Sequence, residues 1–163
     1  MIIRDREYLR SMLFGIEDSL VSTTGLIAGL SIGANNKQIV VLGAAVAIAI
    51  EAVSMGASEY LSDDAVQELD KIKRHKDNPL ISGFLMLLSY LLAGLIPLAP
   101  IMLVGFPGSL YLAVLFALIG LFVLGYSKGK ALNTSPVRGG LKILIVGGLA
   151  TGLGLVVGLL FRI

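Results

Sequence analysis

Four acidic residues lie inside or at the edge of long apolar stretches of the sequence: Glu17, Asp18, Glu51 and Glu59. If these stretches span a bilayer, a charge at its centre costs about 2.5–3.5 kcal/mol on insertion scales. No Lys or Arg stands in the middle of the stretches to neutralise a carboxylate. The four carboxylates are therefore expected to face protein, water or a cation, which makes them candidates for moving ions or protons.

Asp18 opens a stripe of small residues that continues with Ser22, Gly25, Gly29 and Gly33. At about 100° per residue on an α-helix, these positions fall within a wedge of roughly 80°. Small residues let another backbone approach closely inside a membrane. We therefore predict that this stripe is the contact between two copies of the helix, with Asp18 as one half of a paired site.

Met55 is expected at the same depth as Asp18, because the two lie about 8 Å and about 10 Å inside the same membrane boundary on consecutive helices. Glu51 shares the helical face of Met55. Carboxylate plus thioether is a reasonable ligand set for a borderline cation such as Fe²⁺, whereas carboxylates alone also suit Mn²⁺, Ca²⁺ or Mg²⁺. The alternative for Met55 is ordinary packing in an apolar helix.

The other intramembrane acids have two readings each. Glu51 could hold a proton, or it could be neutral and hydrogen-bond to a neighbouring helix. Glu59 lies nearer the interface, where it could pass ions or protons onward or serve a structural role. Glu17 is included in the same path, although at about 100° from Asp18 it could face the interface or a neighbouring helix instead.

Further acids continue beyond Glu59 towards the cytoplasm, namely Asp63, Glu68 and Asp70. On one interpretation they gather cations at the entrance of a pathway. On the other they form a solvated helix face, because Glu68 and Asp70 have basic residues at helical ion-pair spacing after them. The sequence alone leaves both open.

Composition places the chain in a membrane. Of its 163 residues 56% are hydrophobic and 15% are charged, with a mean hydropathy of +0.89, whereas soluble domains are about 45–50% apolar and about 25% charged. The length suits one domain of four to six spans at about 20 residues each. The net charge of +2 indicates no nucleic-acid partner, because the basic residues sit in short loops between apolar stretches.

Several classes of chemistry are excluded or disfavoured. The chain has no Cys and one His, so disulfides and thiolate sites are impossible and a His-rich zinc transporter is not expected. No phosphate-binding glycine loop and no Ser/His/Asp set is present, which argues against an enzyme. The first apolar stretch lacks the pattern of a cleaved signal peptide.

The predicted fold is an all-α integral membrane protein with five transmembrane helices in a single domain over residues 1–163. The expected helices cover residues 11–34, 38–75, 79–104, 109–130 and 139–161. The second helix is expected to leave the membrane and form a short cytoplasmic linker at about 61–78. Asn78 and Pro79 are typical of a helix start, and Pro97 and Pro100 predict a kink or break.

Lys and Arg residues decide the expected orientation. With five spans, 11 of the 13 Lys and Arg residues fall on the side of the amino terminus and the other 2 fall opposite. The amino terminus and the linker should therefore face the cytoplasm, and the carboxyl terminus should lie outside.

Four segments resemble the vacuolar iron transporter family in order along the chain. They are FGIEDSLVSTTGLIAGLSIG, EAVSMGASEYLS, SGFLMLLSYLLAGLIPLAP and SPVRGGLKILIVGGLATGLGLVVG. The second is similar to the family pattern S-M-G-x-x-E-Y-L-S, and the third to an ending G-x-x-I-P-L-x-P. The resemblance covers nearly the whole chain.

This resemblance implies a homodimer of five-helix subunits that moves Fe²⁺, often also Mn²⁺, out of the cytoplasm in exchange for protons. The path would run at the dimer interface between the first helices, lined by Asp18 and Met55, and Glu59 matches the acid of the family's E-Y pattern. Metal ions are then substrates rather than bound cofactors. The partners are a second copy, the metal ion, protons and the lipid bilayer.

The chain also departs from the family pattern. Ser19 replaces the usual Gly after the acid, and the first helix has no Pro. The family's Glu-rich cytoplasmic metal-binding domain between the second and third helices is reduced to about 20 residues, so its glutamates have no counterpart here. A prokaryotic plasma membrane is the expected location, or a vacuolar-type membrane if the protein is eukaryotic. Two rivals stay open, a scaffold without transport and a passive cation channel.

Overall fold

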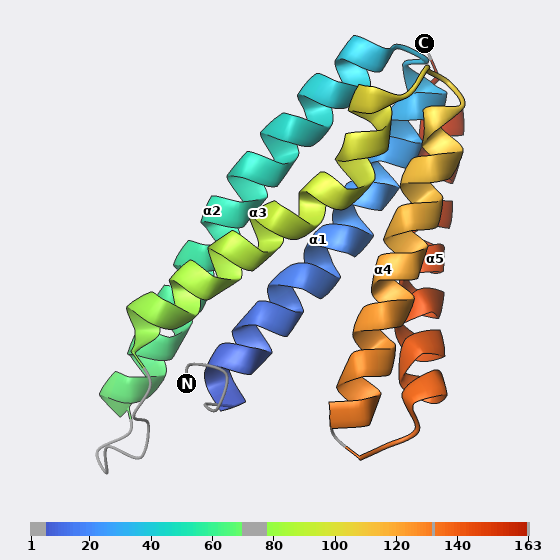
Figure 1. Cartoon of the computed structure of the whole chain (residues 1–163). Coiled ribbons are helices and arrows are strands. Elements are labelled where there is room, and N and C mark those ends of the chain that lie inside the picture. Colours follow the sequence, from blue (N-terminus) through green and yellow to red (C-terminus); the bar gives the residue numbers. More distant parts are fainter. Residues whose placement is uncertain (1–5, 70–77, 132, 163) are drawn as a thin grey trace.

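The computed structural model describes residues 6–69, 78–131 and 133–162, and every regular element among them is an α-helix. The helices are α1 (Arg6–Gly33), α2 (Lys37–Leu69), α3 (Pro79–Leu103), α4 (Ser109–Ala131) and α5 (Pro136–Leu160) (Figure 1). All five are long and apolar enough to cross a membrane. The prediction of an all-α chain with five potential spans is therefore confirmed.

The observed helix ends differ from the predicted ones by a few residues. α1 begins at Arg6 rather than at residue 11, because its charged first turns continue the helix. α5 begins with Pro136 in its first turn, where the missing N–H costs nothing. α2 reaches Leu69, and the rest of the predicted linker, with Asp70, lies outside the described residues.

The start of α3 was predicted correctly, and of the kink or break expected near its far end, the break is absent. The Asn78 side chain accepts a hydrogen bond of 3.0 Å from the backbone N–H of Leu80, and Pro79 follows in the first turn. The helix then runs through Pro97 and Pro100 to Leu103 without a break. Both prolines are buried, and packing by neighbouring helices supports a segment that lacks backbone bonds.

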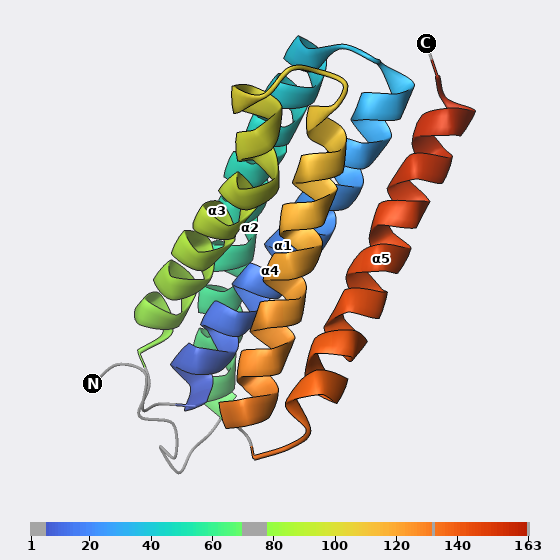
Figure 2. The ribbon, with the colours of Figure 1, turned by 45° about the vertical axis from the view of Figure 1, so that its right-hand side comes forward.

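α1 is the central helix of the bundle. It contacts all four other helices (Figures 1 and 2). Around it, α2 contacts α3, α3 contacts α4, and α4 contacts α5. No contact joins α2 to α5 among the described residues. One flank of α1, between α2 and α5, is therefore left uncovered by the chain itself.

The glycine stripe of α1 packs against α5 of the same chain. A Cβ added to Gly29 would lie 2.8 Å from the carbonyl oxygen of Gly154, and one added to Gly33 would lie 3.3 Å from that of Gly158. Gly25 meets Ala150 in the same way. The expected partner of this stripe, a second copy of the helix, is thus replaced by α5. The reason is that α5 carries a matching stripe of small residues, Ala150, Gly154 and Gly158.

The start of α1, the end of α2 and the connection from α4 to α5 lie at one end of the bundle, and the end of α5 lies at the other (Figures 1 and 2). This arrangement brings the basic segments near one end. Which end faces the cytoplasm stays a prediction from the Lys and Arg distribution.

Candidate functional site

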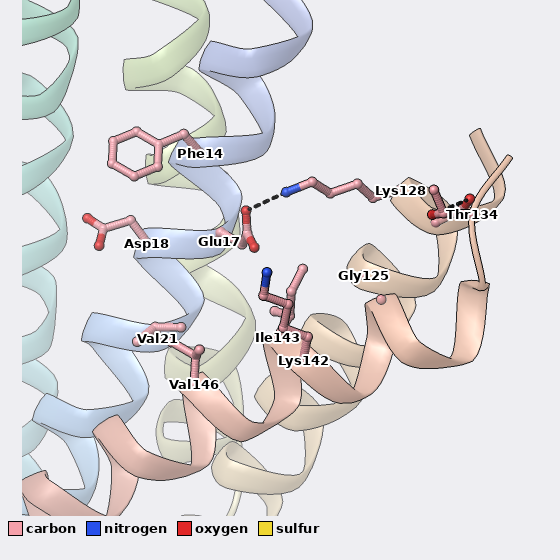
Figure 3. Close-up of a pocket in the computed structure, with 12 residues that line it drawn as sticks. Phe14, Glu17, Asp18, Val21, Gly125, Lys128, Thr134, Lys142, Ile143 and Val146 are labelled. Atoms are coloured by element: carbon pink, nitrogen blue, oxygen red, sulfur yellow. Dashed lines mark hydrogen bonds and ion pairs between the residues drawn. The ribbon is translucent and has the colours of Figure 1, made fainter. Parts of the chain in front are cut away.

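Asp18 is half-buried on α1 and points away from its neighbour Glu17 (Figure 3). The next residue, Ser19, is fully buried, and its hydroxyl donates a hydrogen bond of 2.6 Å to the backbone carbonyl of Tyr90 on α3. Gly94 faces the Ser19 hydroxyl closely from the same helix. The serine that departs from the family pattern therefore fixes α1 against α3 directly beside Asp18.

A polar cluster lies one turn further along α1 and joins three helices. Ser22 on α1 lies 2.7 Å from the Tyr90 hydroxyl on α3, and its hydroxyl donates a 3.3 Å hydrogen bond to Glu51 on α2. The Tyr90 hydroxyl also donates a hydrogen bond to the Glu51 carboxylate. Glu51, which is half-buried, is therefore held by two hydroxyl groups from two other helices.

Asp18 and Glu51 form a carboxylate pair without a basic partner. Asp18 lies one helical turn before Ser22, whose hydroxyl bonds to Glu51, and within the described part of the chain no Lys or Arg forms a salt bridge with either side chain. Two carboxylates in an apolar bundle repel each other unless a cation or a proton lies between them. The pair is therefore suited to a divalent cation or to a proton.

Met55 lies on the α2 face between Glu51 and Glu59. Two hydrogen bonds fix the register of the antiparallel helices, Ser22 to Glu51 and Ser11 to Glu59. Because Met55 is midway between the two glutamates, it is level with residues 16–17 of α1, about 2 Å along the axis from Asp18. Met55 is half-buried, and its role as a ligand stays a prediction.

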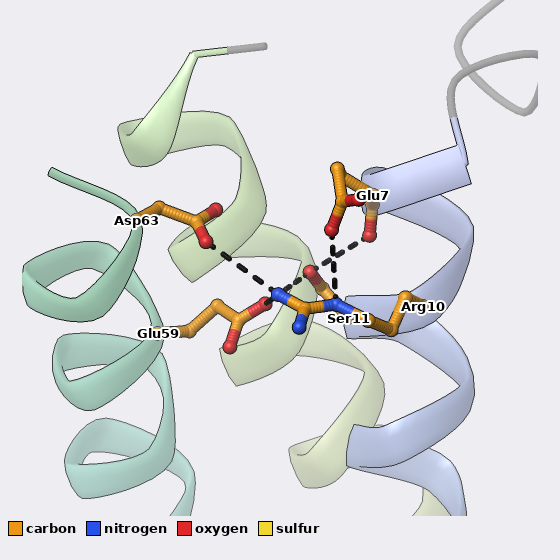
Figure 4. Close-up of polar contacts among 5 residues, drawn as sticks. All are labelled: Glu7, Arg10, Ser11, Glu59 and Asp63. Atoms are coloured by element: carbon orange, nitrogen blue, oxygen red, sulfur yellow. Dashed lines mark hydrogen bonds and ion pairs between the residues drawn. The ribbon is translucent and has the colours of Figure 1, made fainter. Parts of the chain in front are cut away.

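Glu59 lies in a charged network at the ends of α1 and α2 (Figure 4). It accepts a hydrogen bond of 2.5 Å from the Ser11 hydroxyl and one of 3.1 Å from Arg10. Arg10 also contacts Asp63 at 3.5 Å and Glu7 at 3.1 Å. The expectation that the intramembrane acids lack a basic partner is therefore corrected for Glu59, because a long side chain reaches it from another helix.

The expectation of no basic partner is also corrected for Glu17. Its carboxylate lies 3.5 Å from the ammonium group of Lys128, near the end of α4 (Figure 3). The two residues line a cavity of about 460 Å³ between α1, α4 and α5, which Asp18 and Lys142 also line. The structure thus agrees with the alternative given for Glu17, contact with a neighbouring helix, and adds Lys128 as its ion-pair partner.

The three acids proposed for the cytoplasmic entrance have different surroundings. Asp63 belongs to the Arg10 network, Glu68 is exposed near the end of α2, and Asp70 is outside the described residues. Among the described residues, no group of three or more Asp, Glu, His or Cys side chains could hold a metal ion.

The comparisons with known proteins give the family of the chain. A family model described as VIT family matches residues 9–76 and 65–159. The chain belongs to this family. The chain is 26% identical to "Vacuolar iron transporter 1" of Arabidopsis thaliana, over 89% of this chain and 82% of the relative. The proteins of the same name from Eucalyptus grandis and Tulipa gesneriana are 25% and 24% identical, over 89% of this chain and 83% of each relative.

This family member is short. The alignments run over 207 positions, more than the 163 residues of the chain, so the relatives contain a segment that it lacks. The two matches to the family model meet at residues 65–76. These residues cover the last turn of α2 and part of its connection to α3, where the sequence predicts that the cytoplasmic domain is missing.

Two contributors to the site were missed in the sequence, Ser19 and Tyr90. The detectable signal for Tyr90 was a lone Tyr in an apolar span, because a buried Tyr hydroxyl usually has a hydrogen-bond partner. Nothing in the spacing indicated that this partner is Glu51.

Proposed function

We propose that this protein transports Fe²⁺ or Mn²⁺ out of the cytoplasm in exchange for protons, and that Asp18, Glu51 and Met55 line its path. Membership of the VIT family and relatives named vacuolar iron transporters support a metal-ion transporter rather than an enzyme. The observation that carries the proposal is the Asp18–Glu51 carboxylate pair, which lies on helices long enough to span a membrane, is related through the Ser22–Glu51 hydrogen bond, and has no salt-bridge partner among the described residues.

The ligand chemistry favours a borderline divalent cation. Carboxylate oxygens bind Fe²⁺ and Mn²⁺, and a thioether at the level of Asp18 adds a softer ligand that hard cations such as Mg²⁺ do not need. The Ser22 and Tyr90 hydroxyls orient Glu51 from two other helices. This arrangement keeps the carboxylate in place while a cation arrives and leaves.

A second copy of the chain would complete the site. One chain lacks a sufficient group of metal ligands among its described residues, and the flank of α1 between α2 and α5 is uncovered. Lipid tails cannot solvate a half-exposed carboxylate such as Asp18. A homodimer that covers this flank, beside the α5 contact rather than on the glycine stripe, would bring two copies of Asp18 and Met55 together.

Proton exchange follows from the same pair. With a cation bound, both carboxylates are neutralised by it. When the cation leaves, a proton on Asp18 or Glu51 relieves their mutual repulsion. Glu59, Asp63, Glu68 and Asp70 would attract cations at the cytoplasmic end, and the proposed location is a prokaryotic plasma membrane.

The test is Mn²⁺ and Fe²⁺ flux into proteoliposomes under an imposed pH gradient, comparing the wild type with Asp18→Asn. We expect the variant to fall to the rate of protein-free liposomes, because the amide keeps the shape of the carboxylate and removes its charge. Asp64→Asn on α2 is the matched control, since Asp64 is outside the proposed path, and its flux should equal that of the wild type.

Each alternative outcome has a clear meaning. Normal flux in Asp18→Asn contradicts the assignment of Asp18. Wild-type flux that does not respond to the pH gradient and does not saturate identifies a passive channel. No flux of either ion through correctly folded wild-type protein supports a scaffold role.

A further inference from the structure

Arg10 is the one basic side chain that bridges α1 and α2 within the described part of the chain (Figure 4). One terminal nitrogen, Nη2, is shared between Glu59 at 3.1 Å and Asp63 at 3.5 Å. The Nε nitrogen contacts Glu7 of its own helix at 3.1 Å. A single guanidinium thus neutralises carboxylates of both helices.

The exposure of the partners is unequal. The Arg10 side chain is 60% exposed, whereas those of Glu59 and Asp63 are 13% and 16% exposed. The two carboxylates of α2 are therefore mostly covered, and the cation that faces them is attached to a flexible, solvated side chain. Ion pairs with such an exposed partner contribute little to stability, about 0.2–1 kcal/mol, so water and dissolved cations compete readily for these carboxylates.

Removal of Arg10 would leave α1 and α2 joined. The buried hydroxyl of Ser11 donates its own hydrogen bond to Glu59, and this bond does not involve the guanidinium. A structural link between the two helices therefore already exists one residue further along α1. The distinct contribution of Arg10 is its positive charge next to Glu59 and Asp63.

Arg10 also stands at the edge of a cavity. A space of about 720 Å³ extends beside α1, and its charged lining residues are Arg6, Arg10, Glu17, Glu59 and Lys128. Ser11, one helical turn after Glu7 on α1, lines the same cavity. A cation that enters from this end of the bundle meets the Arg10–Glu59 pair before it can reach the level of Met55 and Asp18.

We propose that Arg10 is a built-in competitor for the entering divalent cation: its guanidinium occupies the Glu59 and Asp63 carboxylates and must be displaced before a metal ion can use them. This inference rests on the proposed function, because it assigns Glu59 and Asp63 to the entry of that pathway. It makes Arg10 a residue that sets the affinity for the cation at the entrance, without contact to the Asp18–Glu51 pair.

The experiment measures Mn²⁺ binding to the purified full-length protein in detergent, from the electron paramagnetic resonance signal of free Mn²⁺. Arg10→Gln removes the charge, Arg10→Lys keeps the charge but loses the forked geometry, and Arg6→Gln removes an equal charge one turn away. We expect Arg10→Gln to tighten Mn²⁺ binding by about fivefold, which is the upper range for release of an exposed ion pair. Arg10→Lys should lie between it and the wild type.

Arg6→Gln should leave the dissociation constant unchanged. The double variant Arg10→Gln/Glu59→Gln should bind Mn²⁺ no more tightly than Glu59→Gln alone, because the carboxylate that Arg10 occupied is gone. Equal or weaker Mn²⁺ binding in Arg10→Gln overturns the proposal, and so does the same tightening in Arg6→Gln, which would indicate a general effect of net charge. Arg10→Lys covers the case in which Arg10→Gln does not fold.

Transport kinetics give a second readout. In proteoliposomes, Arg10→Gln should lower KM by the same factor and leave kcat unchanged, whereas a purely structural role would lower kcat or the melting temperature at constant KM. The Mn²⁺ binding comparison needs no transport. Absence of flux in the wild type therefore refutes the proposed function, while the affinities of the variants decide the role of Arg10 separately.

Discussion

The two halves of α1 are held in the bundle by different kinds of contact. Residues 6–18 reach α2 and α4 through charged and polar side chains, from Arg10 and Ser11 to α2 and from Glu17 to α4, while Gly15 packs closely against α3. Residues 25–33 are attached to α5 through backbone contact, where glycines of both helices leave no room for a side chain. One helix thus combines a half with ion pairs that dissolved ions can loosen and a half packed on α5 without them.

This difference matters for a transporter because a path must open at one end while the rest of the fold stays intact. Ion pairs at a solvated helix end exchange with dissolved ions and weaken with salt. Backbone packing depends on shape alone and does not respond to ions. The charged half is therefore the part of α1 that a cation can influence directly.

The largest expected effect is in the half packed through glycine. In Gly154→Ala the new Cβ would collide with the backbone carbonyl of Gly25, whereas a Cβ at Gly152, two residues away, meets nothing within 4 Å. Overpacking of this kind costs about 2–3 kcal/mol, or about 4–12 °C in melting temperature for a chain of this size. Melting curves of the two variants in detergent test this, and equal melting temperatures would contradict the tight α1–α5 contact.

A smaller effect is expected from Ser11→Ala in the charged half. The buried hydroxyl bonds to Glu59, and loss of a hydrogen bond to a charged group costs about 1.5 kcal/mol. Ser62→Ala on the exposed side of α2 is the control and should melt like the wild type. If both serine variants melt alike, the Ser11–Glu59 bond does not join the helices.

The smallest effect is expected from the Glu17–Lys128 pair. A double-mutant cycle of Glu17→Gln and Lys128→Gln should show a coupling of about 0.2–0.5 kcal/mol at low salt, because both side chains are partly exposed. The coupling should shrink towards zero at about 0.5 M NaCl. A cycle of Glu17→Gln with Lys142→Gln, in the same cavity but without an ion pair to Glu17, should show none. Coupling that is unaffected by salt would contradict the description of this pair as a contact that dissolved ions can loosen.

The helices were predictable because apolar stretches long enough to span a membrane alternate with short segments of Asn, Pro, Gly and charged residues. The start of α3 was predictable from Asn78 and Pro79 alone, because capping is a local interaction. The depth of Met55 relative to Asp18 followed from helix rise and from the order of the two spans. These features depend on neighbours in sequence or on simple geometry.

The partners of individual side chains were not predictable. Periodicity shows that the glycines of α1 share one face, but it does not identify which helix covers that face, and α5 has a stripe of the same spacing. Arg10 and Glu59 are 49 positions apart, and their contact depends on how long side chains bend at helix ends. The same holds for Tyr90, whose hydroxyl meets Glu51 only because α2 and α3 pack together.

The central position of α1 also has a consequence for biosynthesis. α1 leaves the ribosome before the other four helices, has the lowest mean hydropathy of the five and carries two adjacent acids, so it is the least favourable of them for insertion on its own. The backbone partner of its glycine stripe, α5, is made after the other four. A nascent chain that stops before residue 136 therefore leaves the α1 stripe uncovered in the bilayer, and completion of α5 becomes the step that covers it.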